Sequence, residues 1–346
     1  MATINQIRGM LLEEAVLQLL RTAGYDVVDS AGNDPTLQEG RSGMEIAGRG
    51  CWHQADALAD FNVNPPFSNP NRLIVEAKCY QLNKPVRLSV VRGCVGVLKD
   101  VSEWWFPSAS IQDTASKGRF HYQYAVFSAS GFSRDAERYA FAQDIYLIPY
   151  QNSRFIRSMI DSIRKVSHID FGAESDNKIN IRLSELRRNV RAALQTRRDF
   201  ELRNFSEYAS ETIGSFLNEV WKIRGTLLAM AGRRFPIHLV PSPSINILEL
   251  RPHYNVRIYY DEVSWYLRDT HTGENLFSFD IPPQLFNLYA EHGHLTESSA
   301  LNLKSEMLNR MQAVLATERE TRLITFKLDA QWINYLKDQL QRFSKL

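Results

Sequence analysis

Asp56, Glu76 and Lys78 are the residues whose types and spacing fit metal-dependent phosphate chemistry. Glu76 and Lys78 lie two positions apart in the apolar run LIVEAKCY, which is typical of an interior strand, so alternation puts both side chains on one face. Carboxylates on neighbouring strands can hold Mg²⁺ through oxygen ligands. Such an ion lowers the pKa of bound water and neutralises charge on a phosphoryl oxygen. The set predicts a site that cuts phosphodiester bonds.

A solvated strand face is the alternative interpretation, because an Asp followed further along by Glu-x-Lys occurs by chance in many sequences. The apolar context argues against it, since charges on an interior strand need a partner or a task. Glu13 has the same need, because helical spacing places it on the apolar stripe of the first helix, whereas Glu14 is expected on the polar side. Glu13 is therefore a third acid expected to converge on the strand pair.

Periodicity and turn signals predict the elements that position these residues. We expect a helix over residues 5–23, a short strand at 25–28 and a loop over 29–50, where Gly, Ser, Asn and Asp are frequent. Strands at 51–61 and 72–80 would carry the acids. A helix at 89–105, a strand at 122–128, a helix at 134–142 and a strand at 145–149 complete the series. This order predicts a compact α/β domain over residues 1–150.

Four pieces of sequence occur in order on these elements. They are Gly9-x-x-x-Glu13, then Gly48-Arg49-Gly50 with His53-Gln54-Ala55-Asp56, then Val75-Glu76-Ala77-Lys78, and finally the run from Phe127 to Ser133 before a helix. Over residues 5 to 150 they resemble the PD-(D/E)xK nuclease superfamily, in its Mrr-like restriction-endonuclease branch. A proline usually precedes the first acid in that superfamily, and this chain has Ala55 there. The resemblance implies a restriction-endonuclease-like fold for this α/β domain, with a central mixed sheet flanked by helices.

The resemblance also implies a role for each matching residue. Asp56 and Glu76 would ligate the metal, with the backbone carbonyl of Ala77 as a further ligand. Lys78 would position the attacking water and stabilise the developing charge. The implied cofactor is Mg²⁺, for which Mn²⁺ can substitute.

Two further residues receive roles in the same way. Glu13 would support the ligands from behind or bind a second ion, and Gln54, on the same strand face as Asp56, would orient a ligand or contact phosphate. Cys51, His53 and Cys79 form only an incomplete zinc set, so we expect buried free thiols and a packed or hydrogen-bonded histidine there.

An arginine-rich segment over residues 180–203 is predicted to be a helix with seven arginines. Guanidinium forks suit phosphate oxygens, so Arg187, Arg188 and Arg191 are candidate nucleic-acid contacts. A solvated helix face is the alternative, because charge runs are commonly exposed to water.

Residues 151–346 are expected to form a second, α+β domain. Its segments are helical over 151–230, a β-meander over 236–281, and mainly helical over 283–346 with a strand at 323–328. We find no helix-turn-helix signature, zinc pattern or P-loop in it. Its expected role is recognition of a target or a partner.

Composition sets the outer limits on these interpretations. The chain has 346 residues, of which 44% are apolar and 23% charged, which excludes a wholly disordered chain and favours two domains. No apolar run reaches the roughly 18 residues of a membrane span, and the N-terminus lacks the pattern of a signal peptide. Three cysteines cannot form an even disulfide framework. These features predict a soluble cytoplasmic protein without a membrane partner.

The leading functional hypothesis is a metal-dependent endonuclease acting on DNA. The resemblance implies a place in restriction or anti-phage defence, with a partner protein of a defence system or a second copy of the chain. A non-catalytic nucleic-acid-binding or interaction protein on a nuclease fold is one alternative. An RNA or repair nuclease is another, because the metal chemistry acts on phosphate and not on the sugar.

Overall fold

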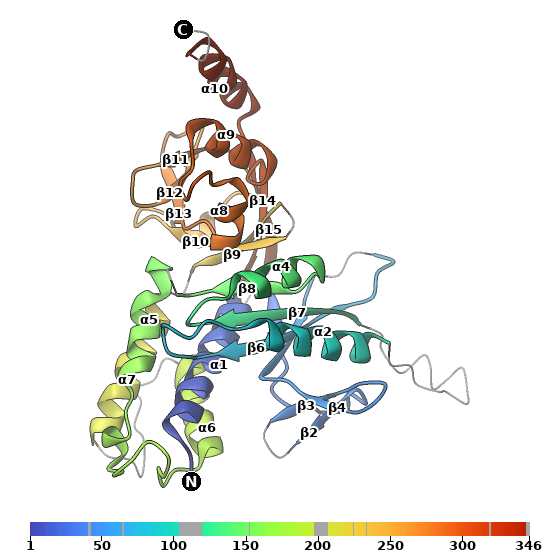
Figure 1. Ribbon diagram of the computed structural model, residues 1–346, viewed down its shortest axis with the longest axis vertical. Helices are drawn as coiled ribbons and strands as arrows, with labels where there is room; N and C mark the ends of the chain where they lie inside the picture. The colour runs from blue at the N-terminus through green and yellow to red at the C-terminus, as the bar shows by residue number, and fades with distance from the viewer. Residues whose placement is uncertain are drawn as a thin grey trace. The chain divides into compact units, whose positions relative to one another are not determined.

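The computed structural model divides into two compact units, Met1–Arg224 and Gly225–Leu346 (Figure 1). The residues it describes are 1–40, 43–63, 66–103, 120–151, 153–196, 207–223, 225–232, 234–317 and 320–343. Within these ranges, the structure contains no helix with the length and apolar character needed to cross a membrane.

The first unit is built on a mixed five-stranded sheet with the strand order β1-β5-β6-β7-β8. β1, β5 and β6 pair antiparallel, whereas β6, β7 and β8 pair parallel. The strands are β1 (Tyr25–Val27), β5 (Ala57–Phe61), β6 (Asn71–Lys78), β7 (His121–Ser128) and β8 (Tyr146–Pro149). Helices cover both faces of this sheet, as expected for an α/β unit.

α2 (Leu88–Ser102) and α4 (Arg134–Ala142) cover one face of the sheet. They bury the side chains of alternate strand residues, among them Ile74 and Val126. Ser133 caps α4, because its hydroxyl accepts a hydrogen bond from the backbone N–H of Ala136 at 3.3 Å.

α1 (Ile4–Thr22) covers the other face and packs on the alternate side chains of β6, such as Val75 and Ala77. A capping box starts it: Thr3 and Gln6 exchange hydrogen bonds between side chain and backbone at 3.2 and 2.8 Å. Beyond this start, the helix is buried around most of its circumference.

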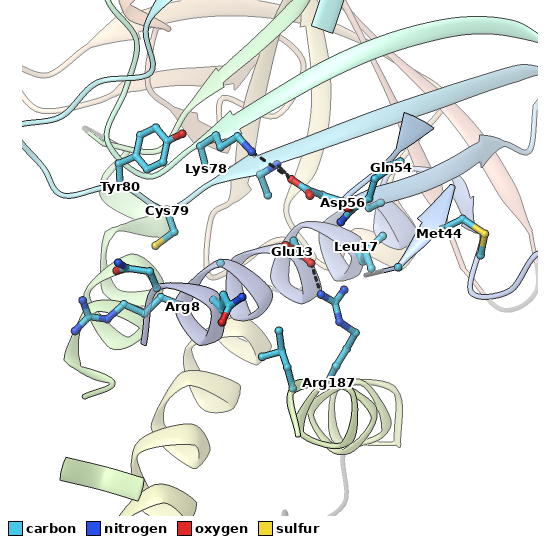
Figure 2. A pocket seen from close by; sticks show the side chains of 18 of the residues that line it. Arg8, Glu13, Leu17, Met44, Gln54, Asp56, Lys78, Cys79, Tyr80 and Arg187 are labelled. Carbon is cyan, nitrogen blue, oxygen red and sulfur yellow. Dashed lines mark hydrogen bonds and ion pairs between the residues drawn. The ribbon is translucent and has the colours of Figure 1, made fainter. Parts of the chain in front are cut away.

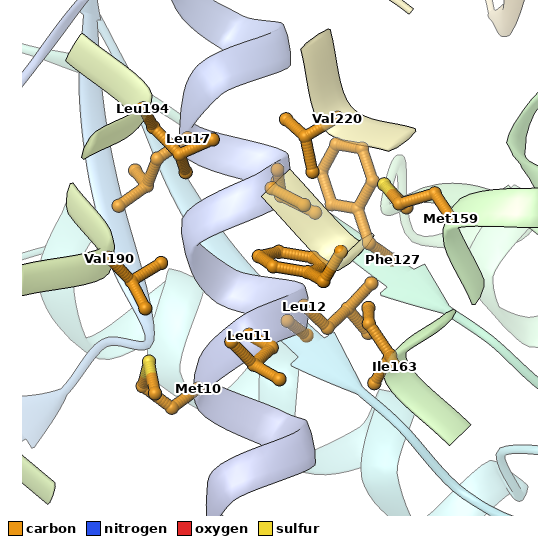
Figure 3. Packing of buried hydrophobic residues seen from close by; sticks show 14 of the residues in the cluster. Met10, Leu11, Leu12, Leu17, Phe127, Met159, Ile163, Val190, Leu194 and Val220 are labelled. Carbon is orange, nitrogen blue, oxygen red and sulfur yellow. The ribbon is translucent and has the colours of Figure 1, made fainter. Parts of the chain in front are cut away.

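Three more helices enclose α1, namely α5 (Arg154–Lys165), α6 (Leu183–Thr196) and α7 (Glu207–Lys222), with the short 3-10 helix η1 (Ile169–Phe171) between α5 and α6. Val190 and Leu194 of α6 meet α1 on one side, and Ile163 of α5 meets it on the other (Figure 3). The first unit therefore ends at Arg224 and not at residue 150, because the amphipathic faces of α5, α6 and α7 belong to the core around α1.

The chain before the acids also differs from expectation. The segment expected to be a loop at 29–50 contains β2 (Leu37–Glu39) and β3 (Met44–Ala47), which form a small antiparallel sheet with β4 (Trp52–Gln54). The single strand expected over 51–61 is broken between β4 and β5, so its two parts pair in different sheets. Asp56 lies at this break.

The second unit is a closed seven-stranded barrel with its own core. Its strands are β9 (Leu227–Ala231), β10 (Phe235–Pro241), β11 (His253–Tyr260), β12 (Trp265–Asp269), β13 (Asn275–Phe279), β14 (Arg310–Ala316) and β15 (Thr321–Leu328). Its helices are η2 (Ile247–Glu249), α8 (Pro283–Tyr289), α9 (Glu297–Glu306) and α10 (Ala330–Phe343). The unit is α+β as expected, but β9 lies in the segment expected to be helical. The strand expected at 323–328 is present as β15, and it pairs in a hairpin with β14, which lies in a region expected to be helical.

Candidate active site

The side chains of Asp56 and Lys78 lie close together. Asp56 lies between β4 of the small sheet and β5 of the central sheet, and Lys78 is the last residue of β6. The Oδ2 atom of Asp56 accepts a hydrogen bond from the backbone N–H of Ala77 at 2.9 Å, which fixes the carboxylate against the end of β6. The Nζ atom of Lys78 lies 3.9 Å from the same oxygen and forms a closer ion pair with Glu76. The structure thus brings the two predicted metal ligands to either side of one ammonium group.

Glu76 lies on the face of β6 that is covered by α2. Its Oε2 atom accepts a hydrogen bond from the hydroxyl of Tyr124 on β7 at 3.2 Å, and its Oε1 atom contacts Lys78. Burial raises the pKa of Tyr124 well above its ordinary value, so this phenol remains a hydrogen-bond donor. The Glu76 carboxylate is consequently fixed from two sides.

The side chains of Asp56, Glu76 and Lys78 are partly buried, and their charges lie close to one another. Burial and the charge of Glu76 raise the pKa of Asp56 above its ordinary value, against the opposing effect of Lys78. Burial alone would lower the pKa of Lys78, but the carboxylates of Glu76 and Asp56 raise it. Carboxylates that repel one another and share a positive neighbour form a donor set that favours a divalent cation. The residues therefore fit Mg²⁺.

Glu13 approaches the same place from α1. Its Oε2 atom accepts a hydrogen bond from Arg187 at 2.6 Å (Figure 2). Burial raises the pKa of Glu13 to about 7; Arg187 opposes this shift and the charge of Asp56 adds to it. Glu13, Asp56 and Lys78 all line one cavity. The convergence expected from the position of Glu13 on α1 is therefore present.

Glu14 corrects the expectation for the polar side of α1. The residue is 1% exposed, and its carboxylate accepts two hydrogen bonds from Arg191 of α6, at 2.8 and 2.7 Å. Arg187 lies 3.6 Å from the same group. Glu14 is buried because α6 packs on the side of α1 that the isolated helix would expose to water.

The three candidate arginines of α6 are therefore not equivalent. Arg187 pairs with Glu13 and Glu14, and Arg191 pairs with Glu14 and, at 2.9 Å, with Asp29. Arg188 is exposed. The solvated-face alternative is thus wrong for Arg187 and Arg191, which are half-buried, and the prediction of phosphate contacts is most direct for Arg188. Of the other four, Arg182 is exposed and lies just before α6, and the arginines at 197, 198 and 203 lie outside the described residues.

The cavity beside these residues has a volume of about 1800 Å³. That exceeds the roughly 300–1,000 Å³ typical of small-molecule sites. Among its described lining residues, nine are Lys or Arg and four are Asp or Glu. The positively charged ones are Arg8, Lys78, Lys84, Arg87, Arg164, Arg182, Arg187, Arg188 and Arg191. An excess of positive charge along a wide cavity favours a large anionic ligand.

Two predicted residues occupy different places relative to this cavity. Gln54 lines it from the end of β4, so Gln54 and Asp56 share the cavity although they do not share a strand. Among the described lining residues, Asp56, Ala77 and Lys78 are present, whereas Glu76 lies behind them beside Tyr124. Glu76 is connected to the cavity through Lys78.

The cysteines differ from expectation. Cys94 is buried, but Cys51 is exposed and Cys79 is half-buried on the cavity wall. His53 is half-buried, and its Nε2 atom lies 2.8 Å from a carboxylate oxygen of Asp100, which sequence reasoning did not single out. Cys51, His53 and Asp100 thus form a second cluster. Local sequence carries no signal for the inclusion of Asp100, because α2 brings this residue to the cluster from far along the chain.

Comparisons with known proteins do not assign a family. No family model matches the sequence, and no curated protein matches it significantly. A solved structure described as a protein of unknown function, AF1548, superposes with a TM-score of 0.33 and 16% sequence identity. The superposition covers 62% of this chain and 97% of that one.

Proposed function

We propose that the first unit is a metal-dependent endonuclease with a restriction-endonuclease-like fold of the PD-(D/E)xK type. The observation that supports this best is the meeting of Asp56, Glu76 and Lys78 at the end of β6, beside a wide and basic cavity. A carboxylate pair with a lysine suits hydrolysis of a phosphodiester, and the basic walls suit the backbone that carries it.

The roles of the residues follow from their positions. Asp56 and Glu76 would hold Mg²⁺, with the carbonyl of Ala77 as a third oxygen donor. The bound ion supplies an acidified water and neutralises charge on the phosphate. Lys78 would orient that water, because its ammonium lies between the two carboxylates. Glu13, with its pKa of about 7, would accept or return a proton beside Asp56.

DNA is the proposed substrate, and defence against foreign DNA is the proposed setting. Both proposals rest on the resemblance of the four sequence pieces. The described cavity residues do not distinguish DNA from RNA, because phosphate-binding groups and metal ligands suit the backbone of either nucleic acid. A second copy of the chain or a partner protein of a defence system remains part of the proposal.

A non-catalytic nucleic-acid-binding protein is the second candidate. One observation favours it: the acids are already neutralised by cations of the protein itself, Glu76 by Lys78 and Glu13 by Arg187. If these ion pairs persist in the presence of Mg²⁺, the cavity would bind nucleic acid without cutting it.

The test incubates the purified full-length chain with plasmid, single-stranded DNA and RNA, each with Mg²⁺, Mn²⁺ or EDTA. We expect cleavage of DNA that requires the metal. Glu76→Gln and Lys78→Ala should each lower the rate at least about 100-fold, because an electrostatic partner of the transition state is lost. Glu211→Gln is the matched control, since Glu211 is an exposed acid of α7 away from the cavity.

The outcomes separate the candidates. Binding without cleavage by the wild-type protein would favour the non-catalytic alternative. Cleavage of RNA alone would keep the mechanism and change the substrate. Undiminished cleavage by both site variants would refute the assignment of the site.

A further inference from the structure

Cys51, His53 and Asp100 form a cluster of ligand-type side chains at the turn between β3 and β4. Cys51 immediately precedes β4, His53 lies in β4, and Asp100 comes from the last turn of α2. Their donor atoms all lie within 4.8 Å of one another. They are absent from the described lining of the basic cavity, so the cluster is separate from the candidate active site.

The distances within the cluster approach those of a tetrahedral metal site. Zinc bonds of about 2.0–2.3 Å place neighbouring ligand atoms roughly 3.3–3.7 Å apart. The Sγ atom of Cys51 already lies 3.6 Å from Nε2 of His53. Nε2 of His53 and Oδ2 of Asp100 are closer, at 2.8 Å, because they share a proton. An ion that replaces this proton would move the two atoms apart by about half an ångström.

The surrounding backbone is shaped to hold this carboxylate and imidazole. The N–H of Gly50 donates to both oxygens of Asp100 at 3.1 Å, which sets the orientation of the carboxylate. A side chain at Gly48 would place its Cβ 2.1 Å from Oδ2 of Asp100 and 2.8 Å from Nε2 of His53. Glycine at this position therefore leaves the room that the two ligand atoms occupy.

We propose that these three side chains bind one Zn²⁺ ion, through the thiolate of Cys51, Nε2 of His53 and a carboxylate oxygen of Asp100. Water completes the tetrahedron, since three protein ligands leave the fourth position open. Thiolate and imidazole donors select zinc over Mg²⁺, which prefers oxygen ligands only. Binding displaces the thiol proton of Cys51, and the neutral imidazole of His53 carries its ring proton on Nδ1 so that Nε2 is free to bind.

The ion would cross-link the small sheet to α2. Asp100 already joins them, because its backbone carbonyl accepts a hydrogen bond from the N–H of Arg49 at 3.0 Å. The chain runs from Cys51 through β4 directly to Gln54 and Asp56, which line the basic cavity. Zinc would therefore fix the segment that carries Asp56 without taking part in the chemistry there.

The competing interpretation is that hydrogen bonds alone join the small sheet to α2, without a metal ion. The hydrogen bonds from His53 and the backbone of Gly50 hold the pKa of Asp100 below its usual range, as expected for an ionised carboxylate with good donors. In that case the thiol of Cys51 would have no role in joining them. Added zinc would then change neither the reactivity of this thiol nor the stability of the protein.

The test titrates zinc into the reduced, metal-free full-length protein in a buffer that contains Mg²⁺. We expect one equivalent to bind, a rise in melting temperature, and protection of Cys51 from alkylation, measured by mass spectrometry. Cobalt in place of zinc should give a thiolate-to-metal absorption band. These readouts on the wild-type protein need no variant to fold and no cleavage activity.

Variants then identify the ligands. Cys51→Ser, His53→Gln and Asp100→Asn should each weaken zinc binding at least tenfold. Cys79→Ser, which changes a thiol outside the cluster, and Asp56→Asn, which removes a proposed magnesium ligand, should bind zinc as the wild type does. Cys51 that alkylates equally fast with and without zinc, or zinc affinity unchanged in Cys51→Ser and His53→Gln, would overturn the proposal. Neither result depends on whether the protein cuts DNA.

Discussion

At the scale of single residues, Glu13 is the acid whose protonation responds to physiological pH. Its pKa is raised from 4.5 to about 7 in the folded protein, so the folded state binds a proton more readily than the unfolded state. This group therefore stabilises the protein below about pH 4.5, and its contribution is lost as pH rises through about 7. At 1.36 kcal/mol per pKa unit, the loss amounts to about 3 kcal/mol.

Glu13→Gln should remove this dependence. The variant should match the wild type in the free energy of unfolding near pH 4.5 and exceed it near pH 8, because a neutral amide replaces a buried charge while it still accepts the hydrogen bond from Arg187. Urea unfolding at both pH values measures the difference, with Glu211→Gln as the control. An equal difference at both pH values would contradict the raised pKa.

Substitutions of Lys78 and of Glu76 should affect the proposed Mg²⁺ binding and the proposed cleavage differently. Lys78→Ala removes a cation that competes for Asp56 and Glu76, so Mg²⁺ should bind at least as tightly as to the wild type while cleavage is lost. Glu76→Gln should weaken Mg²⁺ binding and abolish cleavage together. Titration calorimetry beside a cleavage assay distinguishes the two patterns. Loss of Mg²⁺ binding in Lys78→Ala would show that the lysine has a different role.

Among the elements, α6 contributes both to buried ion pairs and to the basic cavity. Arg191 lines the cavity, and its guanidinium also binds the fully buried carboxylate of Glu14. Arg191→Ala leaves that charge with Arg187 alone at 3.6 Å. We expect a loss of about 3–5 kcal/mol in the free energy of unfolding, as for a buried ion pair that loses one partner. Chemical denaturation measures it, and a loss below about 1 kcal/mol would contradict it.

Arg188 of α6 is exposed and lines the cavity. Arg188→Ala should leave the stability within about 0.5 kcal/mol of the wild type, because it breaks no buried contact. If Arg188 contacts one phosphate, nucleic-acid binding should weaken and its salt dependence should fall by about one unit of slope. Binding measured across a series of salt concentrations tests this, and an unchanged slope would return Arg188 to the solvated-face interpretation.

At the scale of the whole molecule, the boundary between the units predicts which fragments fold. Residues 1–150 lack α5, α6 and α7, so the apolar sides of α1 would face water, and we expect this fragment to aggregate. Residues 1–224 and 225–346 each keep a complete core and should unfold cooperatively on heating. Circular dichroism and size-exclusion chromatography test all three. A soluble, cooperatively folded 1–150 fragment would contradict this account of the core.

Features that depend on local chemistry could be predicted from the sequence alone. Strand alternation predicted that Glu76 and Lys78 share a face, and hydrophobic periodicity predicted the helix and the strand that the structure forms as α1 and β6. A capping residue was predictable too, since Ser133 lies immediately before the helix it caps. Each of these signals lies within a few residues along the chain.

Features that depend on contacts between distant segments could not be predicted in this way. Glu14 is buried because α6, far along the chain, packs on the polar side of α1, and Asp100 meets His53 because α2 crosses the turn before β4. The break at Asp56 arises because β4 and β5 pair with different strands, which alternation within one segment cannot show. Partners of a side chain are chosen by packing across the fold, and the free energy of burying a charge depends on those partners.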